Sequence, residues 1–188
     1  MARPRRNRGH RAELVVFAAL VGTLVAACGS SSSTGASGST TQPPAPAGAA
    51  PSAISRMVCS AKAQRELADP LGVSATVTPP AWTDHTYTCR YQYADGSFTL
   101  SVKELSSWAQ TYAYFDMLRR TLGDTAKATG LGQAAFVTSN GSVVVRKDWK
   151  VLLVDISGLP ARFGVPPTSA SDVAYTVADV IMGCWAGD

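Results

Sequence analysis

The stretch YTCRYQYADGSFTLSVK, residues 87–103, indicates the fold most directly. Large apolar side chains alternate with small or polar ones on both sides of the pair Asp95–Gly96. This alternation predicts strands that each bury one face, and an Asp-Gly pair between two such runs predicts a β-hairpin. The residues expected on the buried face are Tyr87, Cys89, Tyr91, Tyr93, Phe98, Leu100 and Val102.

Three segments around this hairpin have the spacing of amphipathic helices. The first is predicted over Ala53–Ala68, and the second runs from Ser106 or Ser107 to Leu122, with an apolar stripe that begins at Trp108 and Tyr112. The third begins after Ser169 or Ser171. Its apolar face holds Val173, Val177, Val180, Ile181 and Cys184.

Three more strands are predicted at residues 134–139, 142–146 and 149–156, joined by short turns. A further short strand is possible at Val73–Val77. The resulting order is α-β-β-α-β-β-β-α, which predicts an α+β fold with an antiparallel sheet of about five strands and three packed helices. The globular domain is expected at residues 53–188.

The first 27 residues have the pattern of a bacterial signal peptide. Five arginines precede an apolar run from Leu14 to Ala26, which is too short for a transmembrane helix of about 20 residues. Small residues then lead to Cys28, as in the lipobox of bacterial lipoproteins. By that resemblance Cys28 is the lipid attachment site, carrying diacylglycerol and palmitate-type acyl chains. The protein is then expected on the outer face of the cell membrane.

Residues 28–52 are predicted to form a disordered tether, because after Cys28 they contain mainly Ser, Thr, Gly, Ala and Pro and carry no charge. The net charge of +4 belongs to the signal peptide. Residues 1–27 hold five of the 17 basic and one of the 13 acidic residues, so the mature chain has 12 of each. We therefore predict no nucleic-acid partner, which needs a concentrated basic face.

Three cysteines remain in a compartment that permits disulfides. The favoured pair is Cys59 with Cys89, which would join the first helix to the hairpin; Cys59 with Cys184 is the alternative. There is no CxxC motif and no Cys/His cluster, so neither a metal site nor a cofactor is expected.

No catalytic motif is readable, so we predict that the protein is not an enzyme. The alternative is an envelope hydrolase or transferase that uses His85, the one histidine of the mature chain. Among the aromatic residues, Trp82, Tyr91 and Trp149 are the candidates for a ligand-binding surface.

The layout resembles that of uncharacterised actinobacterial cell-envelope lipoproteins. The similar features are the lipobox, the Ser/Thr/Pro tether and a domain with cysteines at Met57–Cys59 and Tyr87–Cys89, followed by segments Gly130–Gly132, Val145–Asp148 and Gly183–Trp185. The resemblance implies an α+β domain stapled by Cys59 and Cys89 and carries over no catalytic residues. Cys184 departs from this two-cysteine pattern.

Together these features predict a membrane-anchored lipoprotein that presents a small domain for binding a ligand or an envelope protein. A structural or accessory subunit of an envelope complex is a further alternative, and it would show an exposed apolar patch.

Overall fold

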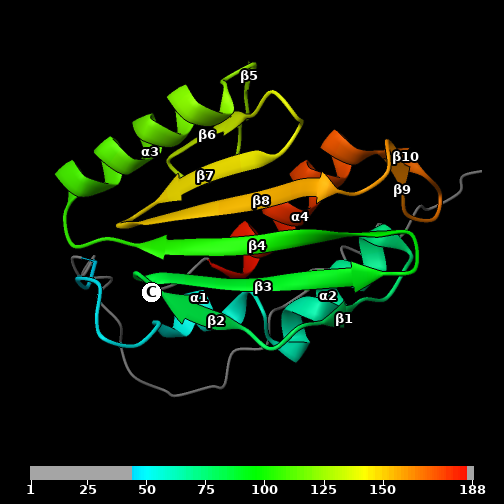
Figure 1. Cartoon of the computed structure of the whole chain (residues 1–188), viewed down its shortest axis with the longest axis horizontal. Coiled ribbons are helices and arrows are strands. Elements are labelled where there is room, and N and C mark those ends of the chain that lie inside the picture. The colour runs from blue at the N-terminus through cyan, green and yellow to red at the C-terminus, as the bar shows by residue number, and fades with distance from the viewer. Residues whose placement is uncertain (1–43, 186–188) are drawn as a thin grey trace, which may run out of the picture. The chain divides into compact units, whose positions relative to one another are not determined.

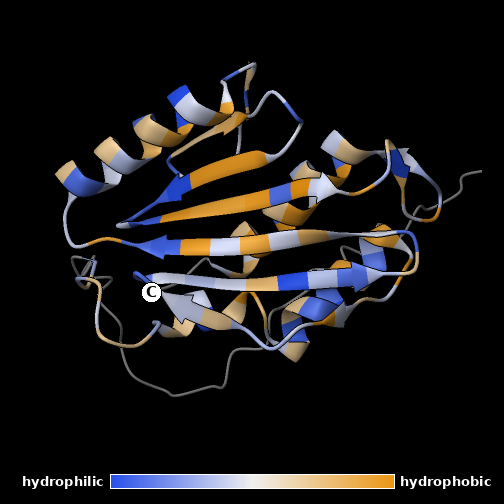
Figure 2. Ribbon diagram, in the orientation of Figure 1, coloured by the Kyte–Doolittle hydropathy of each residue, from blue (hydrophilic) through white to orange (hydrophobic). Residues whose placement is uncertain are grey.

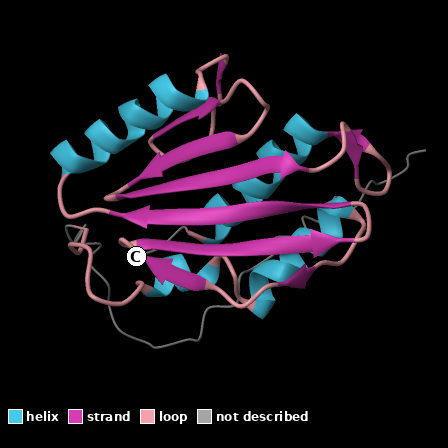
Figure 3. Cartoon of the chain, viewed as in Figure 1, coloured by secondary structure: helices cyan, strands magenta, loops and turns pink. Residues whose placement is uncertain are grey.

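The computed structural model describes residues 44–185, which form an α+β fold with an antiparallel sheet (Figures 1 and 3). The predicted signal peptide and Cys28 lie outside these residues. The helices are α1 (Ala53–Met57), α2 (Ala61–Leu71), α3 (Trp108–Leu122) and α4 (Ala170–Cys184). The strands are β1 (Thr76–Val77), β2 (Ala81–Thr83), β3 (Thr86–Tyr93), β4 (Gly96–Glu104), β5 (Ala126–Lys127), β6 (Ala134–Val137), β7 (Val143–Lys147), β8 (Lys150–Gly158), β9 (Arg162–Phe163) and β10 (Thr168–Ser169).

The main sheet has the order β1-β3-β4-β8-β7-β6-β5, and β2 also pairs with β3. The expected class is confirmed, but the expected count of about five strands is wrong, because this sheet has eight. Of the extra strands, β1 lies within the further short strand expected at Val73–Val77, whereas β2 and β5 contain three and two residues, too few to show a period of two. The hairpin turn contains Ala94 and Asp95, one residue earlier than predicted, since Gly96 already pairs with Tyr93.

The first predicted helix is two helices, so the described residues have four helices where three were expected. The break follows from Ser60, whose hydroxyl accepts a hydrogen bond from the backbone N–H of Ala63 and caps α2. Helix α2 then continues through Pro70 to Leu71 and is capped by Gly72, which has a φ of 64°. A new N-cap inside an apolar pattern is not visible in the spacing of the apolar residues alone.

The two faces of the sheet have different covers. Helices α1, α2 and α4 pack on one face with the main core, while α3 packs on the other face, mainly against β6, β7 and β8 (Figure 1). Strand β7 is therefore buried on both faces, and Val143, Val144 and Val145 form a continuous apolar run (Figure 2). Strand β3 alternates, because no described helix covers the outer side that carries Arg90 and Gln92.

Residues 47–52, which we call the strap, lie along the domain although the sequence predicts a disordered tether there. The backbone N–H of Ala47 donates to Ser106 Oγ at 3.2 Å, and that of Ser52 donates to Glu104 Oε1 at 2.8 Å. The hydroxyl of buried Ser55 donates to the same carboxylate oxygen. The ordered domain thus begins before residue 53.

In the described part of the chain, no helix combines the length and the apolar character needed to cross a membrane.

Candidate ligand-binding pocket

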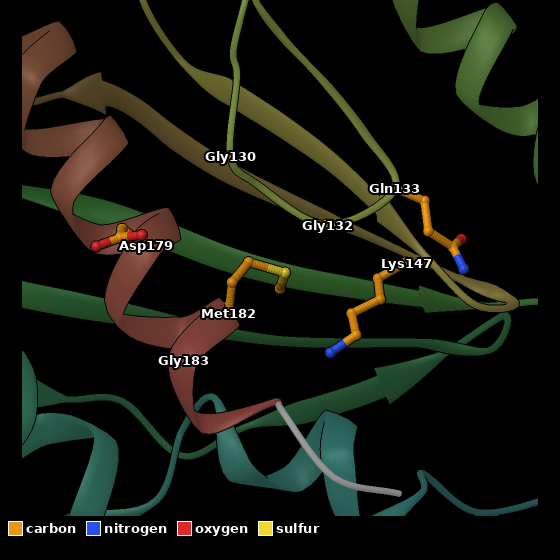
Figure 4. A pocket seen from close by; sticks show the side chains of 7 residues that line it. All are labelled: Gly130, Gly132, Gln133, Lys147, Asp179, Met182 and Gly183. Atoms are coloured by element: carbon orange, nitrogen blue, oxygen red, sulfur yellow. The ribbon is translucent and has the colours of Figure 1, made fainter. Parts of the chain in front are cut away.

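A cavity of about 430 Å³ lies between the β5–β6 loop, the end of β7 and the last turns of α4 (Figure 4). This volume is within the range of small-molecule sites, about 300–1,000 Å³. The residues that line it are Gly130, Gly132, Gln133, Lys147, Asp179, Met182 and Gly183.

The β5–β6 loop forms one wall and is held in place by its own sequence. Leu131 is buried in the core, and the backbone N–H of Gln133 donates to the carbonyl of Arg146 at 2.9 Å. Gly132 has a φ of 53°, and a Cβ there would lie 2.7 Å from the same carbonyl oxygen. Only glycine fits this position, because both the backbone conformation and the close approach to β7 exclude a side chain.

The side chain of Gln133 is fixed to the β7–β8 turn. Its Oε1 accepts from the backbone N–H of Asp148 at 3.0 Å, and its Nε2 donates to Asp148 Oδ1 at 3.4 Å. These two bonds tie the loop to the turn that follows Lys147. The wall of the pocket is therefore preorganised.

Two opposite charges line the pocket without pairing with each other. Lys147 Nζ donates to the carbonyl of Trp185 at 2.7 Å, which holds the ammonium group near the end of α4. Asp179 is exposed on α4, and neither it nor Lys147 takes part in the ion pairs of residues 44–185. Met182 lies between them in Figure 4 and supplies an apolar surface.

Gly183 is in the last turn of α4, and the fold does not require glycine there. It is not among the glycines with positive φ, and a Cβ added to it would have no neighbour within 4 Å. Glycine in a helix is less favourable than alanine by up to about 1 kcal/mol. Since Gly183 lines the pocket, its missing side chain adds to the open volume.

A second cavity of about 150 Å³ lies beside β8, with Asp155 and Ser142 in its wall. Its polar groups are occupied by bonds within the protein. Ser142 Oγ accepts from the backbone N–H of Ile156 at 3.1 Å, and Asp155 Oδ1 accepts from that of Ser157 at 2.9 Å. The first pocket is therefore the better candidate site.

The predicted candidate Trp82 is half-buried and contacts the strap. Its Nε1 donates to the carbonyl of Ala49 at 3.0 Å. His85 packs edge-on against the Trp82 ring, with centroids 5.8 Å apart, and its Nδ1 lies 3.0 Å from the carbonyl of Gly48. Both side chains therefore contact the strap, and within residues 44–185 His85 makes no hydrogen bond to a serine or a carboxylate.

The other two aromatic candidates do not form an exposed platform. Tyr91 is fully buried, stacks on Phe98 and donates its hydroxyl to the carbonyl of Val58 at 2.7 Å. Burial also raises the pKa of Tyr91. Trp149 is half-buried in the β7–β8 turn, and its Nε1 is buried without a hydrogen-bond partner among the described residues. Tyr91 therefore belongs to the core and cannot contact a ligand.

The favoured disulfide is confirmed. Cys59 and Cys89 are bonded, with their Cα atoms 6.0 Å apart, and this bond joins the segment between α1 and α2 to strand β3. Cys184 is outside the disulfide, and its thiol donates to a carboxylate oxygen of Glu66 on α2. Residues 44–185 contain no group of three His, Cys, Asp or Glu side chains placed to hold a metal ion.

Sequence reasoning missed an aromatic patch on α3. Trp108 and Tyr112, expected on the inner stripe, are 38% and 50% exposed. The Arg146 guanidinium, from β7, lies 4.4 Å from the centroid of the Tyr112 ring and 5.9 Å from that of Trp108. The sequence feature that could have indicated this patch is Arg146, because a charged residue is unusual in a strand that is buried on both faces.

No protein-family model, curated protein or solved structure matches the chain. Function is therefore argued from the geometry of the site.

Proposed function

We propose that the protein is an envelope lipoprotein, anchored through Cys28 to the outer face of the cell membrane, whose domain binds a small ligand. The observation that carries this proposal is the pocket at the end of α4. It combines a suitable volume, a rigid glycine-containing wall and two charges that do not pair with each other. The lipid anchor rests on the signal peptide and lipobox pattern of residues 1–28.

The arrangement of the side chains favours binding over catalysis. His85 is held by the strap and contacts the Trp82 ring, whereas Lys147 and Asp179 line the pocket. Nothing in the described residues places His85 together with a nucleophile. We therefore assign the protein to the non-enzymatic binding class, with no cofactor.

Purification of the mature lipoprotein from its envelope in mild detergent, followed by native mass spectrometry, tests the binding function. We expect a bound small molecule that is lost from a Lys147→Met/Asp179→Asn double variant. The matched control is Asp116→Asn/Arg120→Met, which removes the same number of charges from the exposed face of α3. Retention of the molecule by the pocket variant would contradict the assignment of the site.

Labelling with a palmitate analogue tests the anchor. The wild-type protein should carry the label, and a Cys28→Ala variant should not. A label that survives in this variant would rule out Cys28 as the attachment site.

A partner-binding role is the second candidate function, and the exposed pair Trp108 and Tyr112 favours it. Large exposed aromatic residues side by side are common in protein interfaces. Crosslinking in the native envelope distinguishes ligand binding from partner binding when the wild-type protein is compared with a Trp108→Ala/Tyr112→Ala variant. A partner that is lost in this variant, together with an empty pocket, would favour the second role.

A further inference from the structure

The charged side chains that line the pocket indicate the chemistry of its ligand. Lys147 supplies a positive charge from the end of β7, and Asp179 supplies a negative charge from α4. These two side chains do not form an ion pair with each other. Figure 4 shows the two side chains on either side of Met182.

Each charged group retains capacity for a ligand. A lysine ammonium group has three N–H donors, and the hydrogen bond to the Trp185 carbonyl uses one of them. The carboxylate of Asp179 is exposed and accepts no hydrogen bond from a described residue. The two remaining N–H donors of Lys147 match a ligand carboxylate, and the two carboxylate oxygens of Asp179 match a ligand ammonium group.

The surface between the charges is apolar and close to the backbone of α4. Met182 is almost fully buried, so only a small part of its side chain faces the pocket. Gly183 lines the pocket, and a Cβ added there would meet no protein atom within 4 Å. A ligand can therefore lie against the helix backbone at this point.

We propose that the ligand is a short zwitterion of the amino-acid or dipeptide class, with its carboxylate on Lys147, its ammonium group on Asp179 and its middle over Met182 and Gly183. This inference rests on the proposed binding function. Gly183 is then the residue that determines how closely the ligand approaches the helix. Neither the backbone conformation of α4 nor its packing requires a glycine at this position.

Calorimetric titration of the mature lipoprotein with alanyl-alanine tests the charges. Two derivatives of the same dipeptide serve as matched ligands, one N-acetylated and one with an amidated carboxyl end. We expect each derivative to bind at least about tenfold more weakly, because one charged contact is lost. The Asp179→Asn variant should bind the dipeptide and its N-acetylated derivative with equal affinity. The Lys147→Met variant should bind the dipeptide and its amidated derivative with equal affinity.

The Gly183→Ala variant tests the close approach of the ligand to α4, because the stability of the protein should increase while its affinity for the dipeptide decreases. Higher helix propensity should raise the Tm by roughly 2–4 °C, while the added methyl group should weaken dipeptide binding at least about tenfold. Thr121→Ala, on the exposed side of α3, is the control that improves helix propensity away from the pocket and should leave binding unchanged.

The outcomes separate this inference from the proposed function. The assignment of a zwitterionic ligand would be wrong if the dipeptide and its two derivatives bound equally well. It would also be wrong if the protein retained another small molecule from the envelope but did not bind the dipeptide. Unchanged binding in Gly183→Ala would overturn the role of that glycine. In each of these cases, loss of the envelope molecule from the Lys147→Met/Asp179→Asn variant would still support the pocket as the ligand-binding site.

Discussion

Glu104 joins the end of the strap and the start of α1 to β4, so its replacement should have a large effect on stability. Its side chain is at the end of β4 and is only 5% exposed. It accepts hydrogen bonds from the backbone N–H of Ser52 and from the hydroxyl of Ser55, a residue with no exposed surface. In Glu104→Ala both donors lose their acceptor and remain in a partly or fully buried setting.

The expected cost follows from these two donors. A buried polar group left without a partner costs about 1–3 kcal/mol, and hydrogen bonds to a charged group are at the upper end of their usual range. We therefore expect Glu104→Ala to lower the free energy of unfolding by about 3–4 kcal/mol. Glu104→Gln keeps the shape and one acceptor oxygen, so it should lower this free energy by only about 1 kcal/mol.

Urea unfolding of the mature chain, followed by tryptophan fluorescence, measures these differences. Limited proteolysis gives a second readout, because release of the strap should open a cleavage site within residues 44–52 of the alanine variant. Ser106→Ala is the control. Its hydroxyl accepts from Ala47 at an exposed site and should contribute no more than about 0.5 kcal/mol. Stability of Glu104→Ala within 1 kcal/mol of the wild type would refute this account of the strap.

Three further variants test the core and the pocket wall. Replacing Cys59 and Cys89 by alanine opens a cross-link with a sequence separation of 30 and should lower the free energy of unfolding by about 3–4 kcal/mol in urea; a loss below 1 kcal/mol would show that the bond contributes little. Gly132→Ala should cost at least about 2 kcal/mol by the same assay, because it strains a backbone at positive φ against β7, and a neutral effect would contradict the geometry of that wall. Tyr91→Phe removes the donor to a buried carbonyl and should cost about 1–2 kcal/mol with an unchanged m-value, whereas a stabilised variant would argue against that hydrogen bond.

Local sequence patterns were sufficient for much of the fold. The alternation at residues 87–103 identified the two long strands of the hairpin, and the spacing of Val173, Val177 and Ile181 identified the buried face of α4. These features are predictable because a strand or helix repeats its burial every two or 3.6 residues. The pair Cys59 and Cys89 was also favoured over Cys59 with Cys184, as a bond between the first helix and the hairpin, and the structure has this bond.

The aromatic residues show where such patterns fail. Trp108 and Tyr112 have the spacing of the inner stripe of α3, yet both rings are exposed and lie over the guanidinium group of Arg146 on β7. Spacing defines which residues share a helix face. It does not define how far the neighbouring layer extends beneath that face.

The sequence by itself determined the α+β class and the long strands and helices. It also predicts a lipid anchor at Cys28 and, after removal of residues 1–27, a chain of zero net charge. Only the tertiary structure placed Gly183 and Asp179 of α4 beside Lys147 of β7 and the Gly130–Gly132 loop. It also brought the strap onto Glu104. Secondary structure depends on neighbours along the chain, whereas a pocket depends on distances between segments that are far apart in sequence, and these distances are fixed only when the core packs.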